Sequence, residues 1–310
     1  MPDGGVAGPD RLAARLAGSR NWPSTSEPVE WIQTHISHVF LAGERVYKLR
    51  KAVAFPFLDF TTLAARNADC LQEVALNRRL APSVYLGVAP IQQEGETVSI
   101  GPVGEALSAA GLEHVTVMRR LPADRNAQAL LERGALRPSH LEAVAERLRV
   151  FHAENELGRP APWSPYRWLD RVAKPVRDCM KPLADSGLFA DARILKVTES
   201  LERRLATLGP VFEERRRGGF AVEGHGDLHL DHIWFEPDGE VLLIDCLEFN
   251  EALRRIDRAS EVAFLAMDLR YRGRLDLAEC FLASYAAATD DYGIFPVVDF
   301  YAAYRALVRA

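Results

Sequence analysis

The chain has 310 residues, of which 48% are hydrophobic and 26% charged, and its formal net charge at pH 7 is −5. This is the composition of an ordinary globular protein, long enough for two domains or lobes. The net negative charge gives no reason to expect a nucleic-acid partner. Because the sequence has no apolar run of membrane-spanning length and no signal-peptide pattern, we expect no membrane partner and a cytoplasmic protein.

The first third of the chain has the pattern of a small antiparallel sheet. Residues 1–28 are rich in Gly, Pro and Ser, and we expect them to form a partly ordered lead-in. Strand-forming residues then fill 30–41 and 45–49, with a short turn between them, which predicts antiparallel strands. Further strands are predicted within 85–100 and at 115–118.

Lys48 lies in the middle of one predicted strand, and Glu73 lies on the apolar face of a helix that Thr61-Thr62 can cap and that runs to about Leu80. A lysine on a strand most often points into solvent. A carboxylate on an apolar helix face needs a cation, however, because an unpaired buried charge is costly. We therefore expect Lys48 to pair with Glu73, in the arrangement by which kinases hold nucleotide phosphates.

The remainder of the chain has a mostly helical pattern. Apolar residues at helical spacing predict helices near 139–152, 169–180 and 194–208, and more helices follow towards the C-terminus. We therefore assign residues 29–120 to a sheet-containing lobe and residues 121–310 to a helical lobe.

A polar loop and a predicted β-hairpin interrupt these helices. The apolar runs Ile233–Phe235 and Val241–Ile244 flank a Pro-Asp-Gly turn. Asp227 precedes the hairpin and Asp245 follows its second strand, so both carboxylates can lie at one end of a small sheet. Two carboxylates so placed suit phosphoryl transfer, because one accepts the proton of an attacking hydroxyl and the other holds the Mg²⁺ that bridges the phosphates.

The motif from His225 to His229, H-G-D-L-H, followed by Asp245, resembles the loop of the aminoglycoside phosphotransferase (choline kinase-like) family. That loop reads H-G-D-L-H-x-x-N and has a metal-binding Asp after it. Glu261 occupies the second acidic position of a downstream family segment, G-D-P-x-x-D-L-A. Further segments resemble an uncharacterised bacterial branch, some of whose members are fused to a P-loop kinase-like domain: 34–37, 48–51, 57–60 and 76–82.

The resemblance covers roughly residues 29–310 and implies an α+β, protein kinase-like, two-lobed fold. It further implies an ATP- and Mg-dependent transfer of the γ-phosphate to a hydroxyl of a small molecule, such as an amino sugar or an aminoglycoside-like compound. Asp227 would be the catalytic base and Asp245 the metal ligand. His232 stands where the family has Asn. It would ligate the metal weakly or bond to Asp227, or Asp231 would take part of the metal role.

The resemblance also implies how the nucleotide is held. Lys48, oriented by Glu73, would bind the phosphates. Because no Gly-rich loop lies between the first strands, the turn around Ser37 would cover them. Met118 and Arg120 would belong to the hinge that reads adenine, although the same residues also fit a strand that simply ends before a proline.

Two alternative functions remain open from the sequence. His232 in place of Asn, and the missing Gly-rich loop, favour a nucleotide-binding pseudokinase with a regulatory role. His225, His229 and His232, with Asp227 and Asp231, resemble the ligands of a zinc hydrolase. The glycines on either side of His225 argue against the helix that a H-E-x-x-H site needs, and we expect His225 to brace the loop through backbone hydrogen bonds.

Overall fold

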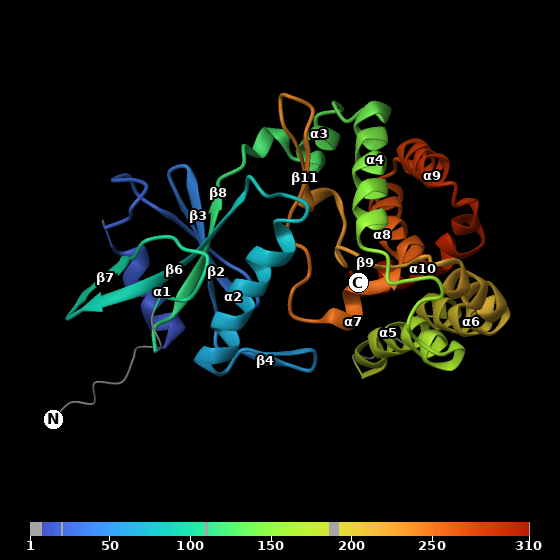
Figure 1. Cartoon of the computed structure of the whole chain (residues 1–310), viewed down its shortest axis with the longest axis horizontal. Coiled ribbons are helices and arrows are strands. Elements are labelled where there is room, and N and C mark those ends of the chain that lie inside the picture. The colour runs from blue at the N-terminus through green and yellow to red at the C-terminus, as the bar shows by residue number, and fades with distance from the viewer. Residues whose placement is uncertain (1–7, 20, 109–110, 186–191, 310) are drawn as a thin grey trace. The chain divides into compact units, whose positions relative to one another are not determined.

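The computed structural model describes residues 8–19, 21–108, 111–185 and 192–309. The chain divides into two compact units (Figure 1). The first comprises Met1–Pro122 with Glu248–Asn250, and the second comprises Ala123–Leu247 with Glu251–Ala310. The first unit therefore also contains three residues that the sequence placed in the helical lobe.

The first unit is built on a six-stranded antiparallel sheet in the order β1-β2-β3-β8-β6-β7. This confirms the small antiparallel sheet predicted from the strand-forming segments. A short hairpin of β4 (Ala54–Phe55) and β5 (Leu58–Asp59) leads into helix α2 (Leu63–Asn77). Of the two threonines expected to cap this helix, Thr62 is the N-cap. The sheet strands are β1 (Glu30–Gln33), β2 (Ser37–Ala42), β3 (Arg45–Arg50), β6 (Tyr85–Glu94), β7 (Thr97–Ile100) and β8 (His114–Arg119).

Helix α1 (Pro9–Ala17) lies within the segment that the sequence presented as a lead-in. Its apolar residues Leu12, Ala13 and Leu16 belong to the same buried core as the side chains of the sheet. The described part of residues 1–28 thus contributes to the core of the first unit. Residues 1–7 and 20 lie outside the described residues.

The two faces of the sheet differ in chemistry, because side chains alternate along a strand. On β3, Tyr47 and Leu49 are fully buried in the core that includes α1. Lys48 and Arg50 point to the opposite face, where α2 packs against β6 and β8. Because side chains two residues apart on a strand share a face, Lys48 and Arg50 both point towards α2.

The second unit is mainly helical, as predicted. Helix α4 packs against α9, α8 packs against α9 and α10, and α5 packs against α6. Among the described residues, no helix is both long and apolar enough to cross a bilayer. The helices are α3 (Ala127–Glu132), α4 (Pro138–Glu154), α5 (Pro165–Asp185), α6 (Ala192–Gly218), α7 (Glu251–Arg254), α8 (Arg258–Tyr271), α9 (Leu275–Thr289) and α10 (Phe295–Val308).

Two small antiparallel sheets hold the polar loop of this unit. The predicted hairpin is present, with β10 (Ile233–Phe235) paired to β11 (Val241–Leu243). The sequence did not indicate the second sheet, in which β9 (Ala221–Glu223) pairs with β12 (Arg255–Asp257). Since β9 precedes the loop and the hairpin follows it, the loop of Asp227 is fixed at both of its ends.

Candidate active site

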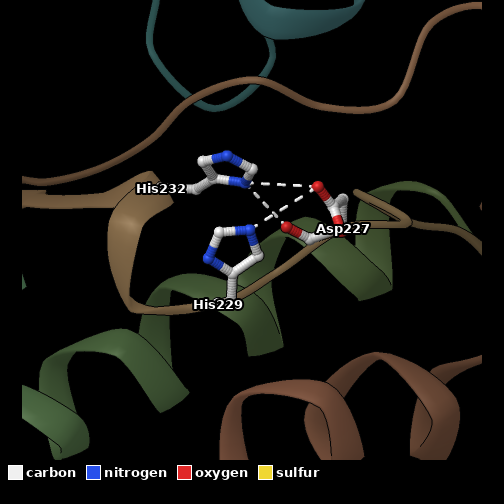
Figure 2. Close-up of side chains that lie close together, drawn as sticks. All are labelled: Asp227, His229 and His232. Atoms are coloured by element: carbon white, nitrogen blue, oxygen red, sulfur yellow. Dashed lines mark hydrogen bonds and ion pairs between the residues drawn. The ribbon is translucent and has the colours of Figure 1, made fainter. Parts of the chain in front are cut away.

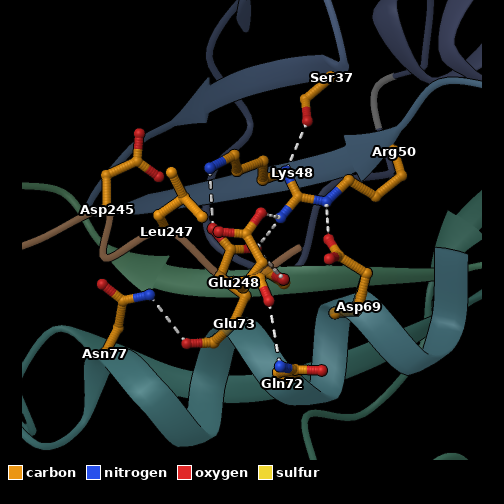
Figure 3. A network of polar contacts seen from close by, with 12 residues as sticks. Ser37, Lys48, Arg50, Asp69, Gln72, Glu73, Asn77, Asp245, Leu247 and Glu248 are labelled. Atoms are coloured by element: carbon orange, nitrogen blue, oxygen red, sulfur yellow. Dashed lines mark hydrogen bonds and ion pairs between the residues drawn. The ribbon is translucent and has the colours of Figure 1, made fainter. Parts of the chain in front are cut away.

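Lys48 and Glu73 form the ion pair that the sequence predicted (Figure 3). The Lys48 Nζ lies 2.8 Å from Glu73 Oε1, and the Glu73 side chain is fully buried. Thr116, on β8, donates its hydroxyl hydrogen to Glu73 Oε2 at 2.7 Å. The carboxylate is therefore held by both strands and fixes the position of the lysine ammonium group.

A second cation, Arg50, joins this pair and was missed from the sequence (Figure 3). Its guanidinium is fully buried and donates to Asp69 Oδ2 at 2.5 Å, to Glu73 Oε2 at 3.1 Å, and to Glu248 Oε1. A signal for it exists in the sequence. Arg50 lies two residues after Lys48 on the strand, and Asp69 lies four residues before Glu73 on the helix, so each pair shares a face.

The burial of this cluster governs its protonation. Burial raises the pKa of Glu248 and of Asp69, although the Arg50 guanidinium opposes the shift in both. Burial alone would lower the pKa of Arg50, but the Glu73, Glu248 and Asp69 carboxylates raise it well above its usual value. Arg50 is therefore a permanent charge at the centre of the cluster.

The structure gives Ser37 a partner other than phosphate. Its side chain is fully buried, and its hydroxyl accepts a hydrogen bond from Arg50 Nη1 at 2.8 Å. The hydroxyl therefore braces the guanidinium, and its contact with phosphate stays a prediction.

The two residues expected at the hinge lie at the end of β8. Met118 is buried in the strand. Arg120 follows the strand with an exposed side chain, and its backbone N–H donates to the carbonyl of Glu44 at 2.8 Å. Their contact with adenine stays a prediction.

In the second unit, the loop that carries Asp227 is held by buried charges from two helices. Glu261, on α8, is fully buried and accepts hydrogen bonds from the backbone N–H of His225 at 2.7 Å and of Gly226 at 3.1 Å. Arg305, on α10, donates to the Gly226 carbonyl at 3.0 Å. The backbone directly before Asp227 is thus held by the Glu261 carboxylate, which accepts from its N–H groups, and by the Arg305 guanidinium, which donates to its carbonyl.

The glycines of the loop make this arrangement possible. A Cβ atom at Gly224 would lie 1.9 Å from Glu261 Oε2, so only glycine lets the carboxylate approach the backbone. Gly226 has φ +86°, a conformation that side chains disfavour. Gly224 is therefore required by the close approach of Glu261, and Gly226 is favoured by its positive φ.

His225 braces the loop through backbone hydrogen bonds, as the sequence predicted. Its Nε2 lies 2.8 Å from the carbonyl oxygen of Ile244, and its Nδ1 accepts from the Asp227 N–H at 3.3 Å. Both ring nitrogens are engaged, so His225 is not a metal ligand in this arrangement.

Asp227, His229 and His232 lie close together (Figure 2). Asp227 Oδ2 is 3.6 Å from His229 Nε2 and 3.7 Å from His232 Nδ1, and one ligand atom from each residue lies within 4.8 Å of the others. Burial favours the protonated form of the carboxyl group, but the neighbouring His229 and His232 rings hold the pKa of Asp227 below its usual value. Asp227 is therefore ionised at neutral pH, as a proton acceptor must be.

Asp245 lies two residues after the end of β11, close to where the sequence placed it, and it has an unusual backbone conformation. Its φ of 61° lies in the left-handed region, which residues other than glycine rarely adopt and which is concentrated at functional sites. The Asp245 Oδ2 lies 3.6 Å from His232 Nε2. Asp227, His232 and Asp245 are thus brought together in the second unit, as predicted from the hairpin.

Comparisons with known proteins agree with these observations. The model of the phosphotransferase enzyme family matches residues 57–295. An uncharacterised protein of Mycobacterium tuberculosis is 36% identical over 299 residues, covering 93% of this chain and 55% of the relative. The chain therefore spans about half the length of the curated relatives it matches.

Solved structures give the fold. An ethanolamine kinase of Plasmodium vivax matches with a TM-score of 0.50 and 11% identity, covering 92% of this chain and 75% of the kinase. An aminoglycoside phosphotransferase of Streptomyces rimosus, in complex with ADP and streptomycin, matches with a TM-score of 0.44 and 17% identity. The match covers 88% of this chain and 92% of the phosphotransferase. The likeness to the ethanolamine kinase confirms the α+β, kinase-like fold, with an antiparallel N-terminal sheet and a helical C-terminal lobe.

Proposed function

Because the chain belongs to the phosphotransferase enzyme family, we propose that it transfers the γ-phosphate of ATP to a hydroxyl group of a small molecule. The observation that carries the proposal is the ion pair of Lys48 and Glu73 on a buried face of the sheet. A strand lysine paired to a helix glutamate is the arrangement that positions nucleotide phosphates in protein kinases. The acceptor that we propose, an amino sugar or an aminoglycoside-like compound, rests on family membership.

In the proposed mechanism, Lys48 holds the phosphates and Asp227 orients the acceptor hydroxyl and takes its proton. A loose transition state asks little of the base beyond position and charge. Both are provided here, because the loop is braced by Glu261 and Arg305 and because Asp227 is ionised.

A divalent cation bound at this site would neutralise charge that develops on the phosphates. The Asp245 carboxylate is an oxygen donor at the end of a strand and fits Mg²⁺. His232 is a nitrogen donor, and an imidazole does not fit the oxygen preference of that ion. Of the two expected ligands, Asp245 therefore fits Mg²⁺ and His232 does not.

The test is an assay of ATP turnover over a broad panel of hydroxylated acceptors, with the variant Asp227→Asn. We expect turnover to fall by about 10²–10⁴-fold, the usual contribution of a positioned base, while ATP binding is kept. The matched control is Asp238→Asn, in the exposed turn of the hairpin, which should leave turnover unchanged.

Two outcomes would contradict the proposal. Full turnover in Asp227→Asn would remove this residue from the chemistry. ATP binding by the parent protein without turnover on any acceptor would favour the pseudokinase.

A further inference from the structure

The hydrogen bond made by His232 fixes which of its nitrogens can bind a metal (Figure 2). His232 Nδ1 lies 2.8 Å from the backbone carbonyl oxygen of Asp227. A carbonyl oxygen can only accept, so Nδ1 carries the hydrogen. In the neutral imidazole the lone pair is then on Nε2.

That lone pair faces a carboxylate. His232 Nε2 lies 3.6 Å from Asp245 Oδ2, and His232 is largely buried. In metal sites, a backbone carbonyl that accepts the other ring N–H sets the tautomer and the orientation of a ligating histidine. His232 therefore has both features of a metal ligand, a directed lone pair and a carbonyl behind it.

A second imidazole, that of His229, lies beside His232. The ring centroids of His229 and His232 are 3.9 Å apart, and the Nδ1 of His229 is buried without a hydrogen-bond partner. Imidazole nitrogen suits Zn²⁺, Ni²⁺ and other late transition-series ions, whereas Mg²⁺ prefers oxygen ligands. Within that series Mn²⁺ binds a given site more weakly than Co²⁺.

We propose that His232 Nε2 and the Asp245 carboxylate bind a transition-series divalent cation in preference to Mg²⁺, and that His232 sets this selectivity. The inference rests on the proposed function for the part that the cation plays with ATP. The binding itself is independent of turnover, so it is tested without nucleotide.

The first experiment measures binding of Mn²⁺, Co²⁺ and Mg²⁺ to the whole protein, by the loss of the free Mn²⁺ electron paramagnetic resonance signal and by competition against it. We expect the order Co²⁺, then Mn²⁺, then Mg²⁺, with at least about tenfold between Mn²⁺ and Mg²⁺. His232→Asn should reduce this ratio at least about tenfold by weakening Mn²⁺ and Co²⁺ binding while leaving Mg²⁺ binding in place. Asp245→Asn should weaken all three, and His35→Asn, at an exposed histidine, should change none.

The second experiment identifies the ligand atom. In protein labelled with ¹⁵N at histidine, Zn²⁺ should shift the His232 Nε2 resonance and leave Nδ1 with its hydrogen. Circular dichroism of each variant establishes that it is folded.

Equal affinity for Mn²⁺ and Mg²⁺ in the parent protein would overturn the proposal. So would a shift at Nδ1, or binding that is lost in His229→Asn and kept in Asp245→Asn, since either would place the ion between Asp227 and the two histidines. Selective metal binding without phosphate transfer would uphold this inference and refute the proposed function. Phosphate transfer without a preference for these cations over Mg²⁺ would uphold the proposed function and refute this inference.

Discussion

At the scale of single residues, Glu261 shows how a buried charge shapes the candidate active site. Its carboxylate accepts backbone hydrogen bonds from His225 and Gly226, directly before Asp227. Burial raises the pKa of Glu261 to about 7, although Arg305 and the two backbone hydrogen bonds oppose the shift. Because its carboxylate bonds to the backbone that leads to Asp227, we regard Glu261 as a positioning residue.

Replacing Glu261 with Gln should disturb the loop without removing volume. One acceptor oxygen becomes an NH₂ group that faces backbone N–H donors, and a buried unsatisfied group costs about 1–3 kcal/mol of unfolding free energy. We expect a kcat at least about tenfold lower, because small displacements of a base are costly, with the KM for ATP little changed. Urea unfolding and steady-state kinetics measure both.

The matched control for that variant is Glu279→Gln, because Glu279 makes an ion pair with Arg270 at the surface. Exposed pairs of this kind contribute about 0–1 kcal/mol. A kcat that is equal in the Glu261 and Glu279 variants would show that the loop holds its shape without the carboxylate.

At the scale of elements, the contact of α4 with α9 contains a buried neutral histidine. His152, near the end of α4, is fully buried, with its Nδ1 2.6 Å from the hydroxyl oxygen of Tyr285 on α9. Burial, together with a smaller contribution from the nearby Arg258, lowers the pKa of His152 to about 3. The packing of these two helices therefore depends on an uncharged ring.

This contact predicts acid sensitivity. The pKa of His152 is about 3 in the folded chain and about 6.5 in the unfolded chain, so between these values the unfolded state binds more protons. The stability that the neutral ring provides is present above pH 6.5 and is lost as the pH falls towards 3, by roughly 1 kcal/mol per pH unit.

The measurement is urea unfolding at pH 7, 5.5 and 4.5 in the parent and in His152→Gln, whose side chain does not titrate in this range. The variant should lose less stability on acidification. Part of the slope should remain, because burial also lowers the pKa of His225 to about 3. Identical slopes would show that His152 does not titrate with unfolding.

At the scale of the whole molecule, the chain crosses between its two units more than once. Residues Glu248–Asn250 belong to the first unit, while the chain on either side of them belongs to the second. Glu248 bonds to Arg50, its backbone carbonyl accepts from Gln72 at 3.0 Å, and Phe249 packs against Phe57. These contacts anchor the segment that follows the proposed metal ligand.

Removing the Arg50 guanidinium should destabilise the first unit strongly. In Arg50→Met, the buried carboxylates of Asp69, Glu73 and Glu248 lose their shared cation, and breaking a buried ion pair costs about 3–5 kcal/mol. Urea unfolding measures the loss, and hydrogen exchange at Glu248–Asn250 should accelerate.

Two further variants serve as comparisons for the stability loss in Arg50→Met. Arg50→Lys keeps the charge but lacks the planar fork that reaches several carboxylates, so it should be intermediate. Arg149→Met, which removes a surface ion pair with Glu146, should cost at most about 1 kcal/mol. A loss in Arg50→Met no larger than in Arg149→Met would refute the prediction.

The sequence by itself determined the features that depend on local pattern. The strand of Lys48, the helix of Glu73 and the hairpin between Asp227 and Asp245 follow from the periodicity of apolar residues and from turn chemistry. The pairing of Lys48 with Glu73 also followed, because a carboxylate on an apolar helix face restricts the choice of partner.

Tertiary structure alone decided the pairings between distant segments. Arg50 and Glu248 are 198 residues apart, and β9 pairs with β12 across the whole polar loop. The tautomer of His232 depends on which carbonyl the folded loop presents to it. The physical reason is that periodicity records which face of an element is buried, whereas the partner on that face is chosen by how the elements pack.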